Sequence, residues 1–443
     1  MTAPSRRDLL RALAVAGGSL GAGGCARALR GRGTAGPGTA RREAATGGRH
    51  HVVRITLDGG FDSVLTVDPR DPRTAGDVDV PYRADDRARG ALRLFGPLIG
   101  RLARHDRDLC LVHGVRHDTV AHDTGEGILR AGRKRFSGGD RPFGDVVGEI
   151  LPGSAPIRHL HIQTGYPEPF SDSLDRVLLP GNPAGRELPM PGEVEVEPGA
   201  LAQLFGAAEP PRFAIPAWFD DVQADAHADA QELLAGRRDE LAACDAALAT
   251  TRNLSRLLAT APHRTALAAS ALGPGLALAL HAIRTDQARF ITVRSPRAWL
   301  DTHTDNLALQ TSRTVPILDD IADFITELKR EPAPGGSLLD HTTVVITSEL
   351  GRFPKLNIAR GKDHWPETSW ILLGRGIRAG ITVGATDAQF RGVPVGYRTG
   401  TPDAPDRRPL DADALFATIL RVAGGNPASH DYGHDSVLQC ILT

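Results

Sequence analysis

Short apolar runs that stop at polar or glycine residues recur along this chain and predict strands. The clearest is HVVRITL at residues 51–57, which is rich in β-branched residues and ends at Asp58-Gly59-Gly60. Runs of the same character are LCLVH, HLHIQ, RFITV and TTVVIT, at residues 109–113, 159–163, 289–293 and 342–347. Apolar runs of this length, bounded by turn residues, are typical of buried strands.

The stretches between these runs have helical character. We predict helices at residues 91–103 and 316–329, a charged, Ala-rich helical insertion at about 216–260, and a last helix at 411–423. Alternation of strands and helices predicts an α/β fold with a mostly parallel central sheet. Ligands collect at the carboxyl ends of such strands, and we expect Asp58, His113 and Glu349 at or just beyond those ends.

The start of the chain has the pattern of an export signal. Arg6-Arg7 precede Leu9-Leu10, and a weakly apolar run continues to Gly24. A charged head followed by a short apolar segment is typical of a signal peptide, and paired arginines are typical of twin-arginine export. We predict a twin-arginine signal peptide at residues 1–28, a Gly/Arg/Ala/Thr-rich linker at 29–48 and one domain at 49–443. The translocase would then be a partner during export.

The sequence offers two alternative processing sites at the end of this signal. Ala26-Arg27-Ala28 resembles a cleavage site, whereas Cys25 resembles a lipoprotein acceptor. Ala22 stands where a lipobox usually has Leu, which favours a soluble periplasmic or secreted protein over lipid anchoring at Cys25. An ordinary amphipathic helix is the remaining alternative. Beyond the leader, no apolar run reaches the ~18 residues of a membrane span.

Composition excludes several classes of protein. The 443 residues carry a formal net charge of −1, which argues against a nucleic-acid binder. Four widely spaced cysteines, Cys25, Cys110, Cys244 and Cys440, fit neither a zinc ribbon nor a disulfide scaffold.

Four segments combine acids with histidine or arginine. They are Asp58–Ser63, His117–Glu126, Asp301–Asn306, and Ser348–Arg352 together with Gly361–Trp365. Taken singly, each segment is more often a structural turn. Together, at predicted strand ends, their carboxylates and imidazoles predict a divalent metal site that suits zinc, with manganese, magnesium or calcium as alternatives.

These segments resemble a known bacterial family. LDGGFDSVLTVDPRD, DTHTDN, VVITSELGRFPKLN and GKDHWPETSWILLGRGIRAGITVGATD are similar to the secreted family called "domain of unknown function 1501". The resemblance covers roughly residues 50 to 390. It implies the alkaline phosphatase–sulfatase fold, in which a mixed sheet lies between helical layers and metals sit at the strand ends.

The resemblance also implies roles for individual residues. Asp58 and Glu349 match the acids that hold one metal in that superfamily, whereas Asp301, His303 and His364 match ligands of its neighbour. His122 resembles a histidine near the helical entry to the site. Arg352 is positioned to neutralise a phosphate or sulfate oxygen.

The function implied is an exported, metal-dependent hydrolase of a phosphate or sulfate ester, on a small molecule or a glycan. Thr124 is the best candidate for the nucleophile, with Thr119 and Ser63 as alternatives; a simple helix cap is the other reading of Thr124. No cysteine has a C-x-P-S-R context, which disfavours a formylglycine sulfatase. The competing hypothesis is a non-catalytic exported binding or assembly protein that keeps the hydrolase fold.

Overall fold

The computed structural model describes residues 48–164, 193–196, 269–432 and 436–443, with 249, 252–254, 256–261 and 267. The predicted signal peptide, the linker and most of the predicted helical insertion lie outside the described residues. The chain divides into two units. The larger comprises Arg49–Pro169, Glu193–Pro211 and Ala261–Thr443, and the smaller Met1–Gly48, Phe170–Gly192 and Arg212–Thr260. All that follows concerns the larger unit.

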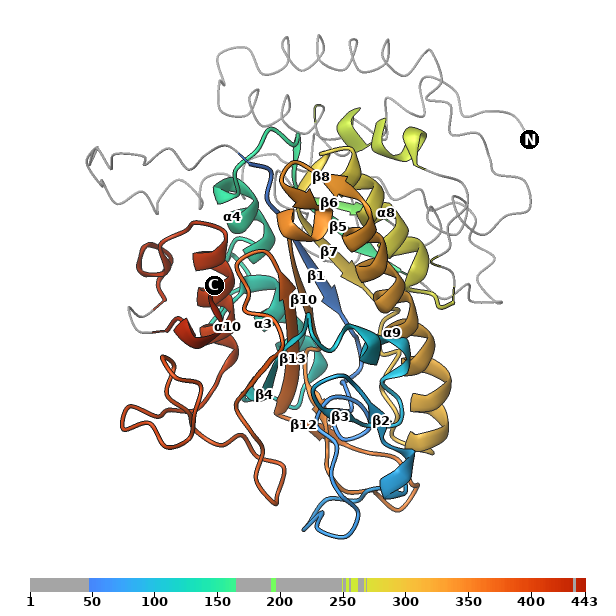
Figure 1. The fold of residues 1–443 in the computed structure, drawn as a ribbon. Helices are drawn as coiled ribbons and strands as arrows, with labels where there is room; N and C mark the ends of the chain where they lie inside the picture. Colours follow the sequence, from blue (N-terminus) through green and yellow to red (C-terminus); the bar gives the residue numbers. More distant parts are fainter. Residues whose placement is uncertain are drawn as a thin grey trace. The chain divides into compact units, whose positions relative to one another are not determined.

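A central sheet of eight strands organises the described part of this unit (Figure 1). Its strands are β1 (His51–Thr56), β4 (Cys110–Arg116), β5 (Ile157–Gln163), β6 (Glu193–Val196), β7 (Ala288–Arg294), β10 (Thr342–Thr347), β13 (Glu367–Gly374) and β14 (Ile381–Val383). Their order across the sheet is β14-β4-β13-β10-β1-β7-β5-β6. Strands adjacent in space are therefore mostly distant in sequence, as in sheets built by crossover connections.

Most neighbouring strands are parallel, as predicted. β1 pairs in parallel with both β10 and β7, and β5 pairs in parallel with β7 and β6. β13 alone runs antiparallel to its neighbours β10 and β4. The carboxyl ends of β7, β1 and β10 consequently lie side by side at one edge of the sheet.

Helices cover both faces of the sheet (Figure 1). They are α3 (His122–Ala131), α4 (Phe143–Ile150), α8 (Gly273–Arg284), α9 (Asn306–Arg330) and α10 (Ala412–Val422). Short 3-10 turns are η2 (Ala84–Asp86), η3 (Gly100–His105), η4 (Leu338–His341), η5 (Pro427–His430) and η6 (Gln439–Ile441). Minor two-stranded ribbons are β2 (Ala88–Arg89) with β3 (Leu94–Phe95), β8 (Pro332–Ala333) with β9 (Gly336–Ser337), and β11 (Gly351–Arg352) with β12 (His364–Trp365).

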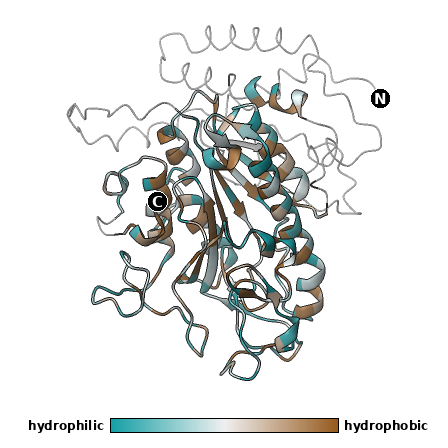
Figure 2. Ribbon diagram, viewed as in Figure 1, coloured by the Kyte–Doolittle hydropathy of each residue, from teal (hydrophilic) through white to brown (hydrophobic). Residues whose placement is uncertain are grey.

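The core lies between the sheet and these helices. On one face, side chains of α3, α4 and α10 form one apolar cluster with strand residues such as Val112, Phe290 and Trp370. On the other face, α8 packs on β7 and on α9. Figure 2 shows the apolar residues concentrated along the central strands. This burial confirms the predicted α/β fold. Among the described helices, none is long and apolar enough to cross a membrane.

Several predicted elements need correction. Residues 91–103 form β3 and part of η3 rather than a helix, because Gly96, Pro97 and Gly100 interrupt the segment. α9 starts ten residues before the predicted Pro316, which lies inside the helix. β13 was not predicted. His113 lies within β4 instead of beyond its end, and its Nδ1 is 3.0 Å from Ser369 Oγ.

Gly59-Gly60 turn the chain sharply after β1. Their φ angles are +102° and +98°, a region that residues with a Cβ rarely adopt. A Cβ at Gly59 would also collide with the backbone of Leu300 and Asp301. This turn therefore lets the loop after β7 approach the end of β1 closely, which places Asp301 beside it.

Candidate metal centre

Acids from three loops meet where the carboxyl ends of β1, β7 and β10 lie together. Asp58 follows β1, Glu349 follows β10, and Asp301 lies in the loop between β7 and α9. Asp58 and Glu349 are each 1% exposed, so both carboxylates are buried and need partners. The sequence prediction that these segments converge is consistent with their positions.

Asp301, His303 and His364 bring three ligand-type atoms close together. Nε2 of His303 lies 3.1 Å from Oδ1 of Asp301, and Nε2 of His364 lies 3.2 Å from the same oxygen. The two Nε2 atoms are 3.0 Å apart. A zinc ion with bonds of about 2.0–2.1 Å separates tetrahedral ligands by about 3.3–3.4 Å, so the spacing fits one such ion.

The other ring nitrogens of these histidines have acceptors. Nδ1 of His364 donates to the Val120 carbonyl at 2.6 Å, and Nδ1 of His303 donates to the Asp363 carboxylate at 3.0 Å. With Nδ1 as the donor in each ring, both Nε2 atoms face Asp301 and each other, where a cation could accept their lone pairs. Acceptors behind ligating histidines are the usual outer partners of a metal site.

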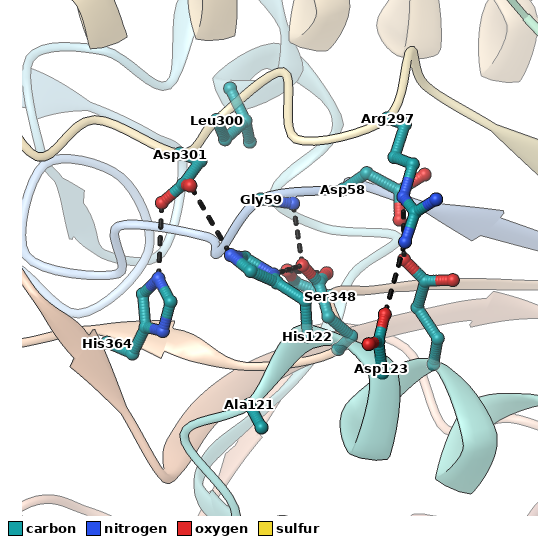
Figure 3. A network of polar contacts seen from close by, with 12 residues as sticks. Asp58, Gly59, Ala121, His122, Asp123, Arg297, Leu300, Asp301, Ser348 and His364 are labelled. Atoms are coloured by element: carbon teal, nitrogen blue, oxygen red, sulfur yellow. Dashed lines mark hydrogen bonds and ion pairs between the residues drawn. The ribbon is translucent and has the colours of Figure 1, made fainter.

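His122, the first residue of α3, joins this group from the opposite side (Figure 3). Its Nδ1 lies 2.7 Å from Glu349 Oε1, and its Nε2 lies 3.5 Å from Asp301 Oδ2. That Nε2 is buried without a hydrogen-bond partner among the described residues. The Asp301 and Glu349 carboxylates raise the pKa of His122 to about 9.

One set of candidate ligands thus has the required proximity. Among the described residues, His122, Asp301 and His364 likewise offer ligand atoms that all lie within 4.8 Å of one another. His303 extends that group through its contacts with the last two. Histidine nitrogens with one carboxylate oxygen are donors that suit zinc.

Asp301 keeps its negative charge in this environment. Burial would raise the pKa of its carboxyl, but contacts with His122 and Arg352 outweigh burial and hold it well below its usual range. Burial likewise opposes ionisation of Glu349, yet hydrogen bonds from His122 and Gly59 lower its pKa. Both acids are therefore carboxylates at neutral pH, as a cation site requires.

Asp58 has a different partner from the one predicted. Both of its oxygens contact Arg294, with Nε 3.1 Å from Oδ2 and Nη2 2.5 Å from Oδ1. Arg294 is the last residue of β7, and its Nη2 also lies 3.3 Å from Glu126. Sequence reasoning missed Arg294, whose one sequence signal is a charged residue at the end of an apolar strand.

Arg352 is buried and contacts Asp301, one of the candidate ligands. Its side chain is 0% exposed, and its guanidinium donates to the carbonyls of Gly59 and Lys362 and to Asp301. With its side chain buried, Arg352 has no open face for a substrate oxyanion. This placement favours a positioning role over the oxyanion contact that the sequence suggested.

The candidate nucleophiles differ in their surroundings. Thr124 is exposed at the third position of α3. It does not cap the helix, because the N-cap is Ala121, without a side-chain cap bond. Thr119 Oγ1 accepts a bond of 3.1 Å from the Ala121 N–H. Ser63 is 3% exposed, and its Oγ has no hydrogen-bond partner among the described residues.

A cavity of about 280 Å³ opens beside His122. Its lining consists of Ala121, His122, Asp123, Glu126, Arg297 and Ala298. Arg297 has a side chain that is 59% exposed, and Figure 3 shows it facing Asp123, 3.1 Å from its Oδ1. Arg297, also missed from sequence, therefore provides an accessible guanidinium beside His122, one of the candidate ligands.

Comparisons with known proteins point in the same direction as the motifs. Residues 221–439 match the family model described as "Protein of unknown function (DUF1501)". No curated protein matches the sequence. The matched region contains the DTHTDN, SELGR and GKDHW motifs, whereas the LDGGFD motif at residues 57–62 precedes it.

Solved structures of hydrolases and a synthase are similar in part. A phosphonate monoester hydrolase from Silicibacter pomeroyi has a TM-score of 0.38 and 13% identity, covering 85% of this chain and 73% of that one. The lipoteichoic acid synthase LtaP from Listeria monocytogenes has a TM-score of 0.36 and 9% identity, covering 88% and 74%. A sulfatase from Pseudoalteromonas sp. has a TM-score of 0.31 and 12% identity, covering 86% and 69%. Over residues 221–439, the chain is therefore similar to the DUF1501 family.

Proposed function

We propose that this protein is an exported metal-dependent hydrolase of a phosphate or sulfate ester. The observation that carries the proposal is the convergence of Nε2 atoms from His122, His303 and His364 on the Asp301 carboxylate. This donor set lies at the carboxyl edge of the sheet, where ligands gather in α/β folds. A bound zinc ion would act there as a Lewis acid on an ester oxygen.

The residues around this centre have separate tasks in the proposal. His122, Asp301, His303 and His364 hold the ion, while Glu349 orients His122 through Nδ1 at 2.7 Å. Arg297 binds a substrate oxygen from the cavity, because its guanidinium is accessible there. The cavity of about 280 Å³ admits a small-molecule or terminal glycan ester.

Thr124 is our predicted nucleophile, close to the N-terminus of α3. The partial positive charge at a helix N-terminus favours anions, so a phosphate or sulfate group at this end of α3 is stabilised. Thr124 is exposed and does not itself line the cavity beside His122. A water molecule that attacks directly is the alternative within the same proposal.

The same observation supports a second candidate, a non-catalytic exported protein that binds a metal or an anionic ligand. In that case the donor set and the cavity are retained for binding alone. Metal binding without turnover of any ester would favour this candidate over the hydrolase.

Export completes the proposal. The twin-arginine motif at Arg6-Arg7 would direct the folded protein to the periplasm or beyond through the translocase. Mass spectrometry of the mature protein distinguishes the two ends of the signal. A start at Leu29 supports soluble export, and a lipid on Cys25 supports anchoring.

The hydrolase proposal is tested with chromogenic phosphate monoester, phosphate diester and sulfate ester substrates. We expect at least one to be hydrolysed, the activity to disappear with a chelator, and a divalent ion to restore it. Asp301→Asn and His364→Ala should each abolish the activity. Asp431→Asn is a matched control, because that carboxylate is 87% exposed and pairs with Arg133, which is not among the candidate ligands. Activity that survives both variants and the chelator contradicts the proposal.

A further inference from the structure

Arg294 forms an ion pair with Asp58, the acid that the superfamily resemblance assigns to one of two metals. Its guanidinium contacts both oxygens of Asp58, at 3.1 Å and 2.5 Å. Such a two-point contact is the strongest arrangement of an arginine and a carboxylate. Asp58 is 1% exposed, so neither oxygen is left to bulk solvent.

Glu349, the second acid assigned to that metal, is also engaged. Its Oε1 accepts from the Gly59 N–H at 2.7 Å and lies 2.7 Å from His122 Nδ1. Its Oε2 lies 2.9 Å from Ser348 Oγ. The candidate ligand group found among the described residues contains neither Asp58 nor Glu349. The donors present therefore do not fit a metal held by these two acids.

Strand register explains why the guanidinium lies at this point. Arg294 pairs with Thr56 across β7 and β1, which sets the arginine beside the end of β1. Its Nη2 also lies 3.3 Å from Glu126 of α3. Buried carboxylates need a compensating positive charge, and Arg294 supplies it from the protein.

The guanidinium is not sealed off completely. The Arg294 side chain is 18% exposed. It lines a second cavity of about 280 Å³, together with Arg54 and Arg130. This cavity shares Asp123 and Glu126 with the one beside His122. The fixed positive charge at Asp58 is thus adjacent to space that an anionic group can enter.

We propose that Arg294 takes the place of a second metal ion, so that the described residues bind one ion only, at the His122–Asp301–His364 group. This inference rests on the proposed function and deepens it, because the second positive charge at the site comes from a side chain. The guanidinium stays in place when metal is removed, whereas a second ion would be lost with the first.

Metal content per chain tests the inference without any activity measurement. The purified protein is reconstituted with excess zinc and desalted, and its zinc content per chain is measured by elemental mass spectrometry. We expect one equivalent in the wild type and one in Asp58→Asn, because Asp58 is not a ligand. His364→Ala should fall well below one. Arg294→Met should gain a second equivalent that is lost again in Asp58→Asn/Arg294→Met.

Arg297→Met is the matched control, since this nearby arginine also faces an acid, Asp123, and should leave one equivalent. Two equivalents in the wild type, falling to one in Asp58→Asn, overturn the role of Arg294 and leave the hydrolase proposal standing. A wild-type value near zero contradicts both. If Arg294→Met does not fold, the comparison of the wild type with Asp58→Asn still decides between one ion and two.

Discussion

Arg352 ties together three loops that come from distant parts of the chain. Its buried guanidinium donates to the Gly59 carbonyl after β1, to Asp301 after β7 and to the Lys362 carbonyl before β12. The compact ammonium group of a lysine could not reach all three acceptors as the planar guanidinium does, so lysine is a poor substitute. Arg352 therefore positions Asp301 for the histidines around it.

We expect Arg352→Met to lower the free energy of unfolding by roughly 3–5 kcal/mol, because it leaves two buried carbonyls unsatisfied and removes a positive charge from Asp301. Urea unfolding measures this loss. Arg330→Met is the control, since that side chain is 73% exposed and its loss should cost about 0.5 kcal/mol or less. Equal effects of the two substitutions would refute the positioning role of Arg352.

Substitution of Thr124 distinguishes two routes of hydrolysis, attack by the threonine hydroxyl and direct attack by water. If its hydroxyl attacks the ester, Thr124→Ala should lose turnover by orders of magnitude while Thr124→Ser retains much of it. Stability should change little, because the side chain is exposed. Steady-state rates of the three proteins on the best ester make the comparison. Full turnover by Thr124→Ala would exclude Thr124 as the nucleophile and favour direct attack by water.

At the level of elements, a buried ion pair connects the loop after β1 to the loop that carries His364. Lys362 Nζ lies 3.0 Å from Asp62 Oδ2, and both side chains are at most 1% exposed. Asn306, at the start of α9, donates to the same Asp62 oxygen at 2.9 Å. The pair fixes the loop that delivers Asp363 and His364 to the site.

We expect Lys362→Met to cost about 3–5 kcal/mol of stability, because it leaves Asp62 as an uncompensated buried charge. It should also weaken zinc binding, since the His364 loop loses its anchor. The double variant Asp62→Leu/Lys362→Met should recover much of the stability without the buried charge. Unfolding curves and zinc titrations measure both effects. A Lys362→Met protein as stable as the wild type would show that the pair does not anchor this loop.

The whole molecule should lose stability in mild acid through buried histidines. Burial, with the nearby charge of Arg375, lowers the pKa of His50 to about 3. Burial also lowers the pKa of His117 to about 4. Unfolded chains protonate histidine near pH 6.5, so protons favour the unfolded state below that pH. The stability that these two neutral histidines contribute is thus fully present above pH 6.5. It falls as the pH drops toward their pKa values in the folded protein.

Each of these histidines should contribute a loss of about 1.4 kcal/mol per pH unit across that window. Urea unfolding at pH 7.5, 6 and 5 measures the slope. His50→Gln should flatten it, because glutamine does not titrate and its amide can replace the 2.9 Å contact with Thr343 Oγ1. An unchanged slope in His50→Gln would contradict the contribution of His50.

Strands were the most predictable part of the molecule. β1, β4, β5, β7 and β10 all fall on apolar runs that the sequence displays directly. β13 escaped prediction because ETSWILLG has no alternation that separates a strand from a buried helix segment. The start of α9 was misplaced because Pro316 resembles a first helical residue, and only packing shows that the helix continues through it.

The site was predictable by residue type but not by pairing. Asp301, His303 and His364 were grouped through the family resemblance, and the structure brings them together. The partner of Asp58 could not be read from sequence, because it depends on the register of β7 against β1. The sequence contains one indication that Lys362 is important. It is one of four lysines in the chain and is adjacent to the Asp363–His364 pair.

Anomalous diffraction at the zinc edge tests the central claim most directly. Crystals of the zinc-loaded protein with vanadate would locate any ion independently of turnover. We predict one anomalous peak, within bonding distance of His122, Asp301 and His364, with vanadate on the side of Arg297. The absence of a peak at these three residues, in protein that is folded and saturated with zinc, would contradict the account.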